Sequence, residues 1–138
     1  MKAGSAVRAL VGLTACLLAL AQSNVGHAAE IASAAIFGSD YQSQAECVVL
    51  NGGTGSLNVT VKILIESGEA RKTYNCGGPV DAGEFCAATA VIARGKAYAC
   101  VATAASVAAL RGALVIQELT PDGSGGFYWR AIRSSPLR

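Results

Sequence analysis

Residues 57–65 read LNVTVKILI and alternate strictly between two kinds of position. The odd-numbered positions lie on one face of an extended chain and are all apolar: Leu57, Val59, Val61, Ile63 and Ile65. A period of two with β-branched residues is typical of a strand that packs one face against a core. This segment therefore predicts a half-buried β-strand and places the chain in a β-rich class.

Short segments of similar composition recur on both sides of this strand. They lie at 31–37, 46–51, 70–76, 86–93, 96–104, 110–119 and 127–132. The glycine-rich stretch 52–56 predicts a hairpin between the strands that flank it, and the stretch 120–126 predicts a turn into the last strand. The alanine-rich segment 103–110 leaves a helical turn open. About seven or eight short strands at this spacing predict an all-β domain, either an antiparallel sandwich or a barrel.

The N-terminus has the order of a secretory signal peptide. Lys2 and Arg8 precede an apolar run at 9–21, and the small-residue stretch 26–29 follows. The run is too short to span a bilayer, which needs roughly 20 helical residues. We expect cleavage after Ala28, so that residues 1–28 are a signal peptide and residues 29–138 form a single domain.

A second cellular location is possible if Cys16 is a lipid-attachment site. The residues Leu13, Thr14, Ala15 and Cys16 resemble the lipid-attachment motif of bacterial lipoproteins, which would imply an anchor on Cys16. The residues after Cys16 are apolar, whereas lipoproteins turn polar there. The expected location is therefore periplasmic or secreted, and a lipoprotein anchored through Cys16 is the alternative.

Loss of the signal peptide changes the chemistry of the chain. The full sequence has a net charge of +2, and removing Lys2 and Arg8 brings it to zero. A neutral chain has no electrostatic basis for binding nucleic acid or an anionic membrane. The only histidine, His27, leaves too, which excludes Ser-His-Asp triads and histidine metal ligands. We therefore expect a non-enzymatic protein without cofactor or metal.

Four cysteines remain in the mature chain: Cys47, Cys76, Cys86 and Cys100. An even number in a small exported chain predicts two disulfides. A four-cysteine zinc site would need pairs two to four residues apart, and the gaps here are 28, 9 and 13 residues. The spacing therefore favours disulfides over zinc.

The motif Tyr98-Ala99-Cys100, together with Cys47 on an earlier strand, resembles immunoglobulin-like sandwiches. The resemblance implies a bridge between the sheets from Cys47 to Cys100, and a corner closed by Tyr98. The remaining pair, Cys76–Cys86, would then close the loop 77–85, although the two other pairings stay open. One departure is that Trp129 follows the second cysteine instead of lying between the two. Such a fold carries no particular function.

The loop 77–85 holds two carboxylates, Asp81 and Glu84. Paired carboxylates can bind Ca²⁺ or act as acid and base, and Asp122 would be a third acidic group for a hydrolase or lyase. Alternatively, the loop closed by Cys76 and Cys86 could be presented to an enzyme by an inhibitor.

Residues 127–130 read FYWR and gather Phe127, Tyr128, Trp129 and Arg130. Aromatic and arginine side chains are enriched at binding surfaces. In a strand, Phe127 and Trp129 face one way while Tyr128 and Arg130 face the other, so we expect one pair in the core. The leading hypothesis is an exported binding or structural module of unknown ligand, whose partner would be a protein or a carbohydrate.

Overall fold

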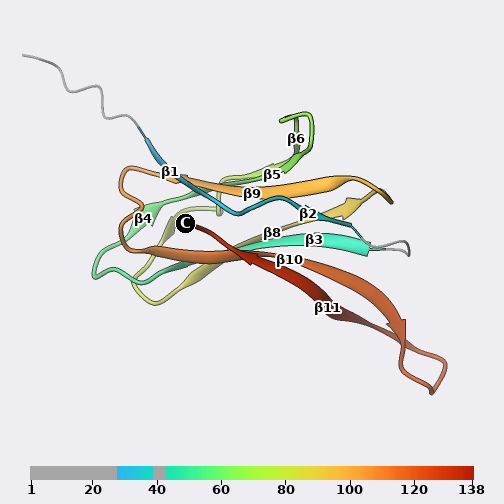
Figure 1. Cartoon of the computed structure of the whole chain (residues 1–138). Coiled ribbons are helices and arrows are strands. Elements are labelled where there is room, and N and C mark those ends of the chain that lie inside the picture. Colours follow the sequence, from blue (N-terminus) through green and yellow to red (C-terminus); the bar gives the residue numbers. More distant parts are fainter. Residues whose placement is uncertain (1–27, 39–42) are drawn as a thin grey trace, which may run out of the picture.

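The computed structural model describes residues 28–38 and 43–138 (Figure 1). Cys16 and the predicted signal peptide up to His27 lie outside the described residues. The described residues form eleven strands and no helix. Seven strands have five or more residues: β3 (Ser43–Asn51), β5 (Thr60–Ile65), β6 (Ala70–Tyr74), β8 (Phe85–Ile92), β9 (Ala97–Ala104), β10 (Leu110–Pro121) and β11 (Phe127–Pro136). The short ones are β1 (Ala29–Ala32), β2 (Ile36–Phe37), β4 (Leu57–Asn58) and β7 (Pro79–Val80).

The long strands make two sheets. Sheet I has the order β1-β9-β5-β6, with β2 also pairing with β9, and sheet II has the order β11-β10-β3-β8. Every pairing is antiparallel, including the small β4–β7 pair. The sheets face each other as two layers, and neither closes on itself (Figure 1). The expected antiparallel all-β sandwich is confirmed.

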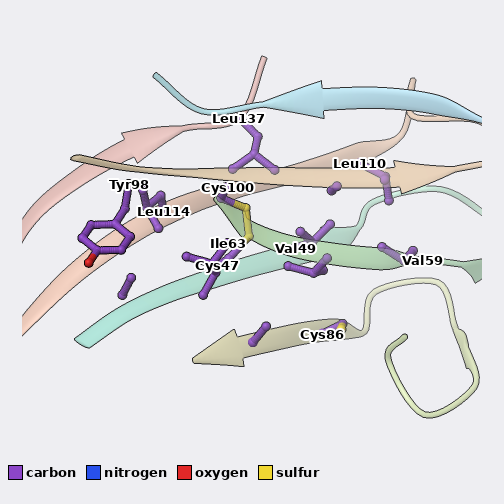
Figure 2. Packing of buried hydrophobic residues seen from close by; sticks show 14 of the residues in the cluster. Cys47, Val49, Val59, Ile63, Cys86, Tyr98, Cys100, Leu110, Leu114 and Leu137 are labelled. Carbon is purple, nitrogen blue, oxygen red and sulfur yellow. A yellow bond between two sulfur atoms is a disulfide. The ribbon is translucent and has the colours of Figure 1, made fainter. Parts of the chain in front are cut away.

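The core lies between the sheets and follows the alternation of the strands (Figure 2). Val59 is 3% exposed, and Val61 and Ile63 are fully buried, which confirms the face predicted for 57–65. That segment is divided after Asn58, because β4 pairs with β7 whereas β5 joins sheet I. Leu114 and Ile116 of β10 cover the same core from sheet II.

The hairpin predicted between 46–51 and 57–65 is wrong. β3 belongs to sheet II and β5 to sheet I, so the turn at 52–56 carries the chain from one layer to the other. The buried Asn51 holds this crossing, because its Nδ2 donates to the carbonyls of Gly55 (2.7 Å) and Val80 (2.9 Å). The turn predicted at 120–126 is present, and it joins β10 and β11 in a hairpin.

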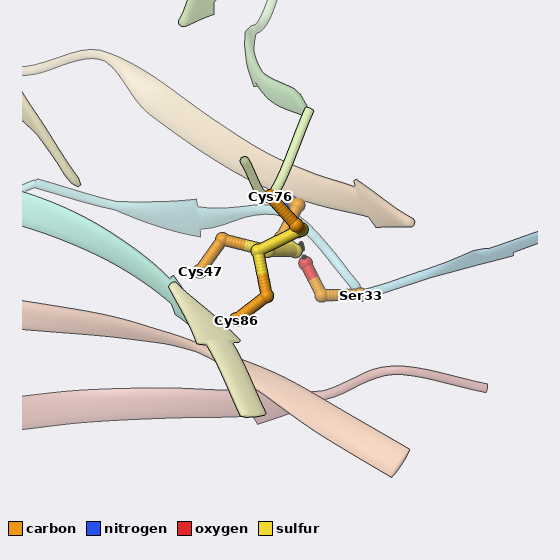
Figure 3. The surroundings of a disulfide bond; sticks show 5 residues. Ser33, Cys47, Cys76 and Cys86 are labelled. Carbon is orange, nitrogen blue, oxygen red and sulfur yellow. Dashed lines mark hydrogen bonds between the residues drawn. A yellow bond between two sulfur atoms is a disulfide. The ribbon is translucent and has the colours of Figure 1, made fainter. Parts of the chain in front are cut away.

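Two disulfides tie the layers together, with the pairing Cys47–Cys100 and Cys76–Cys86 (Figure 3). Cys47 on β3 meets Cys100 on β9 with a Cα–Cα distance of 5.7 Å. Cys76, which follows β6 of sheet I, meets Cys86 on β8 of sheet II at 5.6 Å. Two such bonds indicate an oxidising compartment outside the cytoplasm. Within the part of the chain described, there is no helix that could cross a membrane.

Candidate functional site

The β10–β11 hairpin extends beyond the sandwich (Figure 1). β10 pairs with β3 only from Leu110 to Glu118, whereas its pairing with β11 continues to Pro121 and Phe127. The end of the hairpin is therefore a two-stranded ribbon, because β3 and β8 no longer lie beside it. The aromatic segment predicted as a binding surface lies on this ribbon.

All three aromatic side chains of the segment are exposed. The exposed fractions are 65% for Phe127, 48% for Tyr128 and 39% for Trp129. The side chain of Arg130 is 56% exposed, with its Nη2 3.9 Å from Oε2 of Glu118. The expectation that one pair lies in the core is wrong, because all four side chains are exposed.

The cross-strand register divides the ribbon into two sides. Trp129 lies opposite Leu119 and Phe127 opposite Pro121, so one side is apolar. The other side carries the pairs Tyr128–Thr120 and Arg130–Glu118. A shallow depression of about 180 Å³ lies where the ribbon leaves the sandwich. It is lined by Glu118, Leu119, Thr120, Pro121 and Arg130.

The turn at the tip is organised by Asp122. Its Oδ1 accepts hydrogen bonds from the backbone N–H (2.8 Å) and hydroxyl (2.8 Å) of Ser124 and from the N–H of Gly126 (3.0 Å). These bonds lower the pKa of Asp122 below its usual 3.8, and the bond from the Ser124 N–H has the largest effect. Gly123 and Gly125 have φ values of 81° and 92°, which glycine adopts most readily. The carboxylate thus has a structural role in the turn.

Asp81 and Glu84 lie at the opposite end of sheet II. Asp81 Oδ1 accepts a hydrogen bond from the Ser56 hydroxyl, and the carbonyl of Glu84 accepts from the N–H of Asn51 (2.9 Å). Asn51 pairs with Leu110 at the start of β10, whereas Asp122 follows its end. Twelve residues of strand at ~3.3 Å each separate these ends by ~40 Å. The structure therefore does not bring the three carboxylates of the hydrolase hypothesis together.

The remaining shifted groups are on the surface. Lys96 Nζ lies 2.5 Å from Glu66 Oε1, and Ala97 N–H donates to Oε2 (3.1 Å). The bond from Lys96 is the main cause that lowers the pKa of Glu66, and the same bond raises the pKa of Lys96. This ion pair links the turn that follows β5 to the turn that precedes β9. Among residues 28–38 and 43–138, no three His, Cys, Asp or Glu side chains group so as to hold a metal.

The sequence analysis missed three large apolar side chains on the outside of sheet II: Leu50, Phe85 and Val91 are 39%, 72% and 64% exposed. A signal for two of them was present. Cys86 must point between the sheets to form its disulfide, so Phe85 and Val91, at odd-numbered positions of the same strand, must point outward. Comparison of this chain with family models, curated proteins and solved structures finds no match.

Proposed function

We propose that this chain is an exported, non-enzymatic binding module whose recognition surface is the β10–β11 hairpin. The observation that carries the proposal is the exposure of Phe127, Tyr128 and Trp129 on one projecting ribbon. Aromatic rings lose little conformational freedom on binding and contribute large contact areas, and Trp, Tyr and Arg dominate binding energies at interfaces. A structural role alone does not require exposed rings on both sides of a ribbon.

The ligand class follows from the charge and the chemistry of the ribbon. The mature chain is neutral, which argues against nucleic acid. Rings next to Arg130 suit the apolar faces of a sugar or the side chains of a protein. We therefore propose a carbohydrate or protein ligand.

Export is part of the proposal. β1 begins at Ala29, the residue that would follow cleavage after Ala28. The two disulfides support an oxidising destination, either the periplasm or the exterior. The intact mass of exported protein, alkylated with and without reduction, tests this directly. We expect a chain that starts at Ala29 and contains two disulfides. A chain that starts at Cys16 and carries the additional mass of a diacylglyceryl group would show instead that the protein is a lipoprotein.

An immunoglobulin-like relationship is proposed on two contacts. The Tyr98 hydroxyl accepts a hydrogen bond from the N–H of Ala93 (2.8 Å), as a corner tyrosine does, and Cys47–Cys100 joins the sheets beside it. One difference concerns the strand order. In immunoglobulin domains the last strand lies beside the strand with the second cysteine, whereas here β1 occupies that place and β10 lies beside β3.

A binding experiment with two matched variants tests the proposed function. The hairpin variant is F127A/Y128A/W129A, and the control is D81A/E84A at the other end of sheet II. Each protein is applied to a panel of neutral polysaccharides and is photo-crosslinked, through a reactive group on the exposed Ser124, to proteins of the producing cell surface. We expect ligands bound by wild type and control to be lost by the hairpin variant. Loss in the control alone would favour the inhibitor loop.

A further inference from the structure

The outer face of sheet II, meaning the outward positions of β3, β8, β10 and β11, is unusually apolar for a sheet face in contact with solvent. Leu50, Phe85, Val91, Phe127 and Trp129 all lie on it and are exposed. An antiparallel sheet that faces water normally alternates apolar residues inward with polar residues outward. Leu50 and Phe85 lie at one end of the face and Phe127 and Trp129 beyond its other end, with the half-buried Val48 and Val115 between them. Large apolar surfaces on a protein indicate an interaction site.

The outer face of sheet I gives an internal comparison. Its central strands β5 and β9 direct Thr60, Lys62, Leu64 and Val101 outward, and none of these is among the exposed large apolar side chains. Phe37 on the short β2 is the exposed apolar side chain of this face, at 60%. Sheet II thus presents more exposed large apolar side chains on its outer face than sheet I does.

Four polar side chains on this face already have partners, whereas the exposed Thr89 and Ser134 stay hydrated at its surface. Gln44 Nε2 donates to Gln117 Oε1 (2.5 Å), and Gln117 Nε2 donates to Glu46 Oε2 (2.7 Å), which forms a ladder across β3 and β10. Arg111, the other charged residue at the outward positions of the four strands, donates to the carbonyls of Ala108 and Leu110. Covering the face would therefore bury polar groups that already have hydrogen bonds, which lowers the cost of desolvation.

The size of the face fits a stable interface. β10 and β3 pair over nine residues, and four strands at ~4.8 Å spacing with ~3.3 Å per residue give a planar area of ~19 Å by ~30 Å, or ~570 Å². The apolar side of the ribbon, two strands wide and three residues long, adds ~95 Å² by the same dimensions. The sum of ~670 Å² approaches the ~800 Å² that each partner contributes to an interface of standard size.

We propose that the outer face of sheet II packs against the same face of a second copy of this chain, in a two-fold symmetric dimer. A face of low charge offers little to attract a partner of opposite charge, whereas a flat sheet face can meet itself through a two-fold axis. Sheets stacked face to face lie ~10 Å apart with interleaved side chains. The dimer covers Phe127 and Trp129, and it leaves Tyr128 and Arg130 on the open side of the ribbon for another ligand.

Sedimentation equilibrium of the exported, disulfide-bonded protein tests the proposal at micromolar concentrations. The interface variants are V91E on β8 and W129E on the ribbon, which place a charge on the apolar face. The matched controls are Y128E, on the other side of the same ribbon, and T73E, at an exposed position on the outer face of sheet I opposite Lys62. We expect wild type and both controls to sediment with twice the chain mass. In V91E and W129E the dimer constant should weaken by at least about 100-fold, because each would bury an unpaired charge.

The circular dichroism spectrum and the unreduced mass show whether each variant is folded. A wild type that stays monomeric up to about 100 μM, where even a weak specific dimer would be populated, overturns the proposal. So does a dimer that persists in folded V91E and W129E.

The experiment also separates this inference from the proposed function. If the protein is monomeric and W129E loses a polysaccharide or protein ligand, the face belongs to that ligand. If the protein is dimeric and the hairpin variant F127A/Y128A/W129A keeps its ligands, the proposed function fails while the dimer stands.

Discussion

Removal of each disulfide in turn should destabilise the domain by different amounts. The variants are C47A/C100A and C76A/C86A, and each removes one bond between the sheets. A disulfide stabilises the folded chain mainly because it restricts the unfolded one, and the restriction grows with the logarithm of the loop that it closes. The two bonds differ mostly in this loop length.

The sequence separations are 53 and 10, so the closed loops contain 54 and 11 residues when both cysteines are counted. The chain-entropy relation then predicts losses of about 4.2 kcal/mol for C47A/C100A and about 2.8 kcal/mol for C76A/C86A. Cys47 and Cys100 are fully buried, so the alanines also leave a void and add to the first loss. The difference of about 1.4 kcal/mol or more corresponds to at least a tenfold ratio of unfolding constants.

Urea unfolding followed by far-ultraviolet circular dichroism measures both losses. Each variant needs its own fitted slope, because an unfolded chain without a cross-link exposes more surface. A domain of this size has a total stability of roughly 5–15 kcal/mol, so C47A/C100A should keep roughly 1–11 kcal/mol at 25 °C and unfold at a lower urea concentration. If C76A/C86A proves equally or more destabilised, the loop-length reasoning is refuted. Local packing at the end of β6 would then dominate.

Three further changes test other parts of the structure. Asn51→Ala should lower the free energy of unfolding in urea by about 2–3 kcal/mol, because the carbonyls bonded by the buried amide, including that of Val80, would lose their donor. A loss below about 0.5 kcal/mol would contradict that role. Gly112→Ala should cost about 1–3 kcal/mol or more, since a Cβ there would lie 2.3 Å from the Val48 carbonyl oxygen, and an unchanged melting temperature would exclude the contact. The folded-state pKa of Asp122 is lowered, so its contribution is present above its ordinary pKa of 3.8 and is lost as pH falls through the folded value. The protection of the tip amides, meaning their exchange rate relative to the intrinsic rate at the same pH, should therefore fall in acid for wild type, whereas Asp122→Asn should show no such acid step.

Features of the sandwich that depend on local pattern were predictable. The alternation in 57–65 located a core-facing strand, and the pairing Cys76–Cys86 is the one that remained once the resemblance had implied Cys47–Cys100. The partner of each strand was less accessible. A glycine-rich turn such as 52–56 has the same composition whether it reverses the chain within a sheet or transfers it to the other layer. The buried Asn51 distinguishes the two cases here, because its bonds to both the turn and β7 form only when the chain crosses.

On the aromatic ribbon, the alternation of side chains no longer predicts which side is buried. Alternation correctly separates Phe127 and Trp129 from Tyr128 and Arg130, since each set shares a side in the cross-strand register. A side of a strand becomes buried only where another layer covers it, and that depends on where strands distant in sequence end. The described pairing of β3 with β10 stops opposite Glu118, and Phe127, Tyr128 and Trp129 beyond it are exposed on both sides of the hairpin. A long hairpin that continues past its neighbours therefore exposes both sides of an alternating pattern. For that reason, aromatic residues near such a tip are better candidates for binding than the same residues in the middle of a sheet.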